Sequence, residues 1–253
     1  MKELVEAVRT YGKGIGTDIV KVDMFLNHRL DTNLLVKMGQ AFADVFACEK
    51  PDLVLTIEAS GIAAALTTAM ACGNIPVVFA KKSSTRNVTG DVYESTVFSF
   101  THGVENHVRV AKEYLPAGAR VLIIDDFLAN GEAAEGLCDL CRQAGATVVG
   151  IGICVEKAFQ PGHQKLEKDG YKVHALAKVL GIEDGKLLPP FVAISGLGES
   201  AAWDLMEGRK GKTFLSIEEV AAACPKVSKT HIQMLKDAGA FGSLPDTSQV
   251  SLF

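Results

Sequence analysis

The stretch that decides the fold reads Val121-Leu122-Ile123-Ile124-Asp125-Asp126-Phe127-Leu128-Ala129-Asn130-Gly131-Glu132-Ala133-Ala134. Its first four residues are apolar, as in a strand that is buried on both faces. Two carboxylates follow where that strand should emerge, and a turn of small residues then leads into a helix. Backbone N–H groups at a helix start, assisted by the helix dipole, bind phosphate. The stretch therefore predicts a sugar-phosphate site, although the acidic pair alone also fits an ordinary helix cap.

Strand and helix patterns alternate along the first part of the chain. Strands are expected at Leu53–Glu58, Pro76–Ala80, Val92–Phe100, Arg120–Asp125 and Thr147–Glu156. Helices are expected at Lys2–Thr10, Leu34–Ala47, Ile62–Cys72 and Gly131–Ala144. This order predicts an α/β fold with a mostly parallel sheet, in which ligands bind beyond the carboxyl ends of the strands. The loops after Glu58, Ala80, Asp125 and Glu156 are therefore the expected site.

Composition changes at Leu187-Leu188-Pro189-Pro190, where two prolines favour an extended linker. We expect one domain over residues 1–188 and a small all-α module over residues 189–253. The 253 residues carry a net charge of −4, which gives no whole-chain attraction to nucleic acid or anionic membrane. Neither a secretory leader nor a membrane-spanning stretch is apparent, so a cytoplasmic protein is expected. Cys138 and Cys141 form a C-x-x-C inside a helical pattern, which favours buried thiols over a metal site.

Five blocks of residues 1–188, in order and spacing, resemble the type I phosphoribosyltransferases of purine salvage. They are the opening stretch and the segments 20–28, 56–63, 76–82 and 150–162. The resemblance implies that family's fold, including a small amino-terminal hood. It also implies transfer of a ribose 5-phosphate from phosphoribosyl pyrophosphate (PRPP) to a purine base, here xanthine. A homodimer, and Mg²⁺ carried in on PRPP, are implied as well, with no metal ligands assigned to the protein.

The resemblance also implies which residues bind PRPP. Asp125 and Asp126 are the expected catalytic pair, which would hold the ribose hydroxyls and stabilise positive charge on the ribose ring. The remaining PRPP-binding residues are expected to be Ala129, Asn130, Gly131, Glu132, Ala133, Ser60, Gly61 and Lys81. Glu132 stands where relatives often carry a neutral amide, so its carboxylate is expected to point outward. Lys81 and Lys82 also fit a plain solvated surface. Ser83–Ser95 resembles a flap over the substrate.

The base is expected to contact Val20, Asn27, Lys157 and Phe159. An ammonium at Lys157 would favour a 6-oxo purine over adenine, and the amide of Asn27 would donate to a second oxo group. Phe159 would stack on the base, with core packing as the alternative, and Asn27 also fits an ordinary turn. Two alternatives remain: a hypoxanthine or guanine enzyme, and a nucleotide-sensing module without catalysis.

The module over residues 189–253 is similar to a helix-hairpin-helix. It also resembles the carboxyl end of the Gram-positive type of replicative DNA polymerase III alpha chain. Its last five residues, Gln249–Phe253, resemble a peptide that docks on a sliding clamp. The module carries six basic and seven acidic residues, so it has no excess of positive charge to attract DNA phosphates. Nucleic acid is therefore not an expected partner. An accessory remnant without a DNA role remains the alternative to clamp docking.

Overall fold

The computed structural model describes residues 1–82, 91–99, 104–194 and 196–248, with the side chains of all but 98, 99 and 104–106. The chain divides into two compact units, Met1–Pro189 and Pro190–Phe253. Within the described residues, no helix is long and apolar enough to span a bilayer.

A parallel sheet of five strands forms the centre of the first unit, in the order β4-β3-β7-β8-β9. The strands are β3 (Leu53–Ile57), β4 (Val77–Ala80), β7 (Arg120–Leu128), β8 (Thr147–Lys157) and β9 (Val173–Val179). Every pair is parallel. Helices return the chain to the same end of the sheet between β3 and β4, β7 and β8, and β8 and β9, whereas an antiparallel hairpin lies between β4 and β7. The predicted α/β architecture is therefore confirmed.

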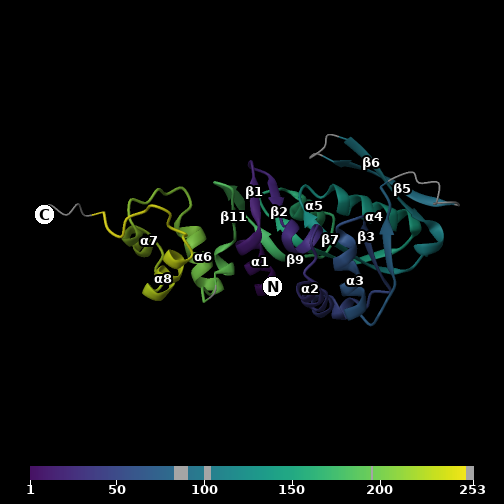
Figure 1. Cartoon of the computed structure of the whole chain (residues 1–253), viewed down its shortest axis with the longest axis horizontal. Coiled ribbons are helices and arrows are strands. Elements are labelled where there is room, and N and C mark those ends of the chain that lie inside the picture. Colours follow the sequence, from purple (N-terminus) through teal and green to yellow (C-terminus); the bar gives the residue numbers. More distant parts are fainter. Residues whose placement is uncertain (83–90, 100–103, 195, 249–253) are drawn as a thin grey trace. The chain divides into compact units, whose positions relative to one another are not determined.

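Alternating residues of the buried strands feed a separate core on each face of the sheet. Leu122 and Ile124 pack with α1 (Lys2–Tyr11), α2 (Thr32–Val45) and α3 (Gly61–Ala71). Val121 and Ile123 pack on the other face with α4 (Glu132–Ala144), α5 (Gly162–Lys168) and the hairpin of β5 (Val92–Ser99) and β6 (Val104–Ala111). Figure 1 shows α2 and α3 on one side of the strands and α4 and α5 on the other. Burial of both faces explains the unbroken apolar runs in the sequence.

Three antiparallel hairpins surround this sheet. β5 (Val92–Ser99) pairs with β6 (Val104–Ala111), β1 (Lys13–Ile15) with β2 (Ile19–Lys21), and β10 (Gly181–Glu183) with β11 (Lys186–Leu188). Short helical turns lie at Asp23–Asn27, Ala47–Glu49 and Lys112–Tyr114. The predicted strand from residue 92 is thus one arm of a hairpin outside the main sheet. Val92–Ser95 of the predicted flap belong to this arm, and residues 83–90 lie outside the described part.

The second unit is built from short helices around a small apolar core. They are a turn at Phe191–Ala193, α6 (Glu199–Gly208), α7 (Ile217–Ala223) and α8 (Lys229–Asp237). Ser216 is buried and caps α7 by accepting a hydrogen bond from the amide of Glu219. Leu205, Val220 and Leu235 belong to the core of this unit.

Candidate active site

The acidic pair lies inside β7 rather than beyond it. β8 goes on pairing with Phe127 and Leu128, so β7 continues three residues past the predicted end at Asp125. Asp125 and Asp126 are only 4% and 7% exposed. Burial raises the pKa of Asp125 well above its ordinary value, and the neighbouring Asp126 carboxylate raises it further. Among the described residues, neither carboxylate forms an ion pair.

The predicted pyrophosphate loop reaches this pair directly. A Cβ placed on Gly61 would lie 2.2 Å from Thr56 Oγ1 and 2.9 Å from Asp125 Oδ1, so only glycine fits at the start of α3. Ser60 precedes the helix, and its side chain does not cap it. The backbone amide of Lys82 donates to Glu58 Oε1 at 2.7 Å, which joins the loop after β3 to the residues after β4.

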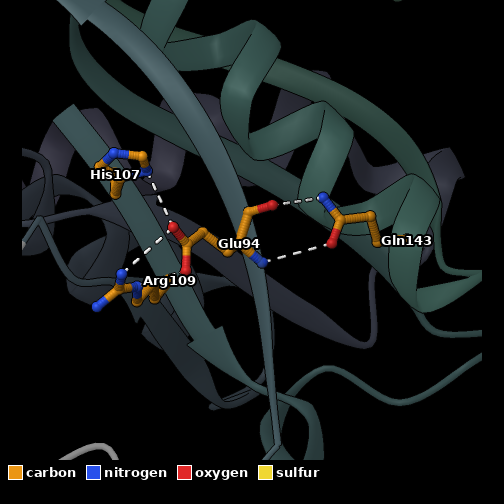
Figure 2. A network of polar contacts seen from close by, with 4 residues as sticks. All are labelled: Glu94, His107, Arg109 and Gln143. Atoms are coloured by element: carbon orange, nitrogen blue, oxygen red, sulfur yellow. Dashed lines mark hydrogen bonds and ion pairs between the residues drawn. The ribbon is translucent and has the colours of Figure 1, made fainter. Parts of the chain in front are cut away.

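Lys81 is held through the β5–β6 hairpin. It exchanges two backbone hydrogen bonds of 3.0 Å with Arg109. The Arg109 side chain donates twice to the Glu94 carboxylate, which also contacts His107 Nδ1 at 2.9 Å. Figure 2 shows Glu94 between these two residues and Gln143. The Gln143 side-chain amide accepts a hydrogen bond from the backbone N–H of Glu94 and donates one to its backbone carbonyl. Contacts therefore run continuously from α4 to Lys81.

The predicted phosphate turn lies between β7 and α4. Gly131 has a φ of 102°, which a residue with a side chain rarely adopts. Ala129 and Asn130 are half-buried, as are Glu132 and Ala133 in the first turn of α4.

The Glu132 carboxylate was expected to point outward, but one of its two oxygens is buried. Glu132 Oε1 is buried and has no hydrogen-bond partner among the described residues. Glu132 is half-buried, so its carboxylate does not point wholly into solvent.

The predicted base contacts come from two separate segments that meet. Lys157 ends β8, and its Nζ donates to the carbonyl of Asp18 at 2.8 Å, two residues before Val20. Burial lowers the pKa of Lys157. Asn27 Nδ2 donates to Asp126 Oδ2 at 3.5 Å, so the amino-terminal segment reaches the acidic pair as well.

The other two predicted base residues differ in exposure. The Phe159 side chain is 36% exposed, which favours a free ring face over core packing. Val20 is 7% exposed and belongs to the same core cluster as Leu4 and Val8 of α1.

Two residues that the sequence analysis did not assign to the site, Thr56 and Gln160, have unusual burial. Within the described part of the chain, Thr56 Oγ1 and Gln160 Oε1 are buried without hydrogen-bond partners, like Glu132 Oε1. Buried polar atoms are nearly always paired, so an unpaired one marks a candidate functional position. All three lie near the carboxyl ends of β3, β7 and β8. Thr56 and Gln160 stand inside the blocks that carry the resemblance, but linear spacing gives no indication of their burial.

Comparisons with known proteins agree with this geometry. The family model described as the phosphoribosyl transferase domain matches residues 31–180, more than half of the chain. A model described as the helix-hairpin-helix motif matches residues 170–250. The xanthine phosphoribosyltransferase of Bifidobacterium longum is 53% identical over 179 residues, covering 71% of this chain and 93% of that protein. That of Laribacter hongkongensis is 48% identical, covering 74% and 98%.

Solved structures share the fold. Adenine phosphoribosyltransferase from Thermoanaerobacter pseudethanolicus aligns with a TM-score of 0.52 at 25% identity, covering 58% of this chain and 82% of that one. The enzyme of that name from Rhodothermus marinus aligns with a TM-score of 0.58 at 21% identity, covering 70% and 99%. The type I fold predicted from the sequence is therefore confirmed. The chain belongs to the phosphoribosyltransferase family and, within it, to the xanthine phosphoribosyltransferases.

Proposed function

We propose that this chain transfers the 5-phosphoribosyl group of PRPP to xanthine, giving xanthosine 5'-monophosphate and pyrophosphate in purine salvage. The observation that carries this proposal is the 53% identity to a xanthine phosphoribosyltransferase of which the chain covers 93%. A ring nitrogen of the base bonds to the anomeric carbon, the bond from that carbon to the pyrophosphate oxygen breaks, and pyrophosphate leaves with the electron pair. The proton of the attacking nitrogen passes to water.

The acidic pair is proposed to stabilise the ribose ring as positive charge develops on it. Charge stabilisation by groups that are already in place is a large catalytic effect, and burial strengthens it. Asp125 lies beside Gly61, and Asp126 beside Asn27, so the pair lies between the proposed pyrophosphate loop and the base segment. The contacts to the ribose hydroxyls remain a proposal.

Magnesium is proposed to arrive bound to PRPP. Among the described residues, no three His, Cys, Asp or Glu side chains group as a metal site. The oxygen-rich acidic pair nevertheless fits a hard ion that keeps most of its own waters, because carboxylates accept hydrogen bonds from such waters. When bound, the ion would neutralise charge on the departing pyrophosphate.

Base selection is proposed to depend on Lys157. An ammonium has three N–H donors, and the carbonyl of Asp18 takes one of them, which leaves donors for an oxygen at position 6 of a purine. Asn27 keeps a second amide N–H for the 2-oxo group. Adenine presents a donor at position 6 and would face the ammonium unfavourably.

A base-competition assay tests the proposed function. The full chain receives PRPP, Mg²⁺ and equal xanthine, hypoxanthine and guanine, with adenine as the control, and the nucleotides formed are separated. We expect xanthosine 5'-monophosphate to dominate. A preference for hypoxanthine or guanine would favour the neighbouring activity, and no product from any base would favour a nucleotide-sensing module.

The second unit and the assembly remain proposals. We propose that Gln249–Phe253, which lie outside the described residues, dock on a sliding clamp. Clamp pull-down by the full chain, but not by a chain lacking these residues, tests this. The division of roles between residues 1–188 and 189–253, the homodimer and the cytoplasmic location stay predictions. Light scattering tests the dimer. A groove of about 900 Å³ beside β4, with half-exposed Phe79 and Tyr114 in its wall, is a surface that a second copy could cover.

A further inference from the structure

The segment from Ala158 to Gly162, which follows the proposed base contact Lys157 (the base loop), touches the phosphate turn through two facing glycines, Gly162 and Gly131. A Cβ on Gly162 would lie 2.4 Å from the Ala129 oxygen and 2.8 Å from the Gly131 nitrogen. A Cβ on Gly131 would lie 3.2 Å from the Gly162 Cα. Both close contacts at Gly162 are with backbone atoms, which cannot turn aside as the end of a flexible side chain can.

Gly162 does not need to be glycine for its own backbone. Its φ lies outside the left-handed region, unlike that of Gly131. The residue is therefore required by the close approach of a second backbone. That second backbone is the turn whose N–H groups are proposed to bind the 5-phosphate.

Two hydrogen bonds fix the orientation of the turn. The amide of Gly162 donates to the Ala129 carbonyl at 3.1 Å, and the amide of Glu135 donates to the Gly131 carbonyl at 2.9 Å. Both carbonyl oxygens are thereby engaged, and neither is free to face a phosphate, which would repel it. The turn is left to present its N–H groups to an anion.

The next residue anchors Gly162 to the strand that carries the base contact. His163 Nδ1 contacts Glu156 Oε2 at 2.9 Å, and its Nε2 contacts Glu167 Oε1 at 3.2 Å. Glu156 is buried and precedes Lys157. A rigid connection therefore runs from the proposed base contact through His163 and Gly162 to the phosphate turn.

We propose that Gly162 is a positioning residue for PRPP: from the base loop, it sets the position and orientation of the phosphate turn. This inference rests on the proposed function. A methyl group at position 162 must push the turn away and would crowd the Gly131 N–H. Misplacement by about 1 Å can reduce activity by about 100-fold.

The test compares Gly162→Ala with Gly181→Ala in the full chain. A Cβ on Gly181 would meet only Leu188 Cδ1, at an ordinary 3.5 Å. We expect Gly162→Ala to raise the KM for PRPP and the dissociation constant of ribose 5-phosphate by about 10- to 100-fold. The KM for xanthine should change much less, and Gly181→Ala should alter none of them. A merely structural role would reduce kcat through loss of folded protein and leave these constants unchanged.

His163→Gln provides a second variant that adds no bulk. Loosening the anchor should raise the ribose 5-phosphate dissociation constant by about 3-fold. A folded Gly162→Ala protein with unaltered ribose 5-phosphate binding overturns the inference. If Gly162→Ala does not fold, an unaltered constant for His163→Gln overturns it instead. Calorimetry with ribose 5-phosphate needs no turnover, so it tests this inference even if the chain makes no xanthosine 5'-monophosphate.

Discussion

Two buried acidic regions lie at the ends of neighbouring strands, and they differ in their partners. Asp125 and Asp126 near the end of β7 have no ion pair among the described residues. Glu156 near the end of β8 is 3% exposed, contacts His163 at 2.9 Å and pairs with Lys178 at 3.1 Å. Leu128 of β7 and Glu156 of β8 are register partners, so both regions share one edge of the sheet.

The difference separates a structural acid from a functional one. A buried carboxylate without a cation reduces stability, whereas one with partners is compensated. Strongly shifted carboxylates in a site are candidates for chemistry. The free-energy cost of burying the Asp125 carboxylate is explained if its partner is the positive charge that develops on the ribose ring during the reaction. The partners of Glu156 are all side chains of the chain itself, which is typical of a structural role.

The largest expected effect is on the acidic pair. Asp125→Asn with Asp126→Asn should lower kcat by at least about 100-fold, because the charge that stabilises the reacting ribose is lost. Steady-state rates at saturating PRPP and xanthine measure this. Asp44→Asn, on an exposed site of α2, is the control and should keep the wild-type rate. A double variant with near-normal kcat would break the comparison.

Asp125→Asn alone should also make the protein more stable at pH 7.5, by about 1 kcal/mol. Since burial raises the pKa of Asp125 in the fold, the charged form is penalised there. The penalty is full above the raised pKa and absent below the ordinary value of about 3.9. The advantage over wild type in urea unfolding should therefore shrink as pH falls. A less stable Asp125→Asn protein would contradict the assignment.

The next largest effect is expected at Lys157, a cation at the same edge of the sheet. Lys157 is half-buried and is held only by the Asp18 carbonyl among the described residues. Lys157→Ala should reduce kcat/KM for xanthine by about 10- to 100-fold, the value of a hydrogen bond from a charged donor. The KM for PRPP should stay near normal. Lys165→Ala, exposed on α5, is the control. Undiminished use of xanthine would refute the assigned contact.

A smaller effect on activity is expected at the paired acid. Glu156→Gln should lower the free energy of unfolding by about 1–3 kcal/mol, because His163 and Lys178 lose a charged partner. We expect kcat to stay within about 3-fold of wild type, since no part of the reaction uses this carboxylate. Glu167→Gln, which removes the exposed partner of His163, should alter stability less. A stable Glu156→Gln protein without activity would reverse the two roles.

The smallest expected effect is at Glu132. Its carboxylate lies in the first turn of α4, beside the proposed phosphate site, where like charge opposes binding. Glu132→Gln should therefore lower the KM for PRPP by about 2- to 5-fold, the size of a single weak charge interaction. Asp44→Asn, on an exposed site of α2, is again the control. A raised KM would show that the carboxylate contributes to binding.

The central strands could be predicted because both of their faces are buried. β3, β7 and β8 each contain a run of apolar residues, and the predicted starts agree with the observed ones. The exit of β7 is less predictable, because pairing with β8 outlasts the apolar run. β9 and α5 were not predicted: β9 is an edge strand with half-buried residues, and α5 has only seven residues. Val108 and Val110 of β6 alternate inward, a signal of a strand that could have been used.

Some residues of the candidate site could likewise be predicted from the sequence, and others could not. Asp125, Asp126 and Lys157 follow apolar runs, so their place at one edge of the sheet could be predicted. Thr56 and Gln160 stand out through the burial of a side-chain oxygen, and Gly162 through its close approach to Ala129 and Gly131. Linear spacing shows neither burial nor contacts between distant segments. The orientation of Glu132 was misjudged because the burial of a side-chain oxygen depends on tertiary packing, which the linear sequence does not show.

The rung between Lys81 and Arg109 has a mechanical consequence. It extends the parallel sheet by one antiparallel step, so the hairpin and the edge of the sheet are continuous there. Swinging the hairpin away would break two backbone hydrogen bonds at the lysine proposed to meet pyrophosphate. The two hydrogen bonds of that bridge therefore limit how far Arg109 of β6 can move without displacing Lys81, the residue proposed to contact pyrophosphate.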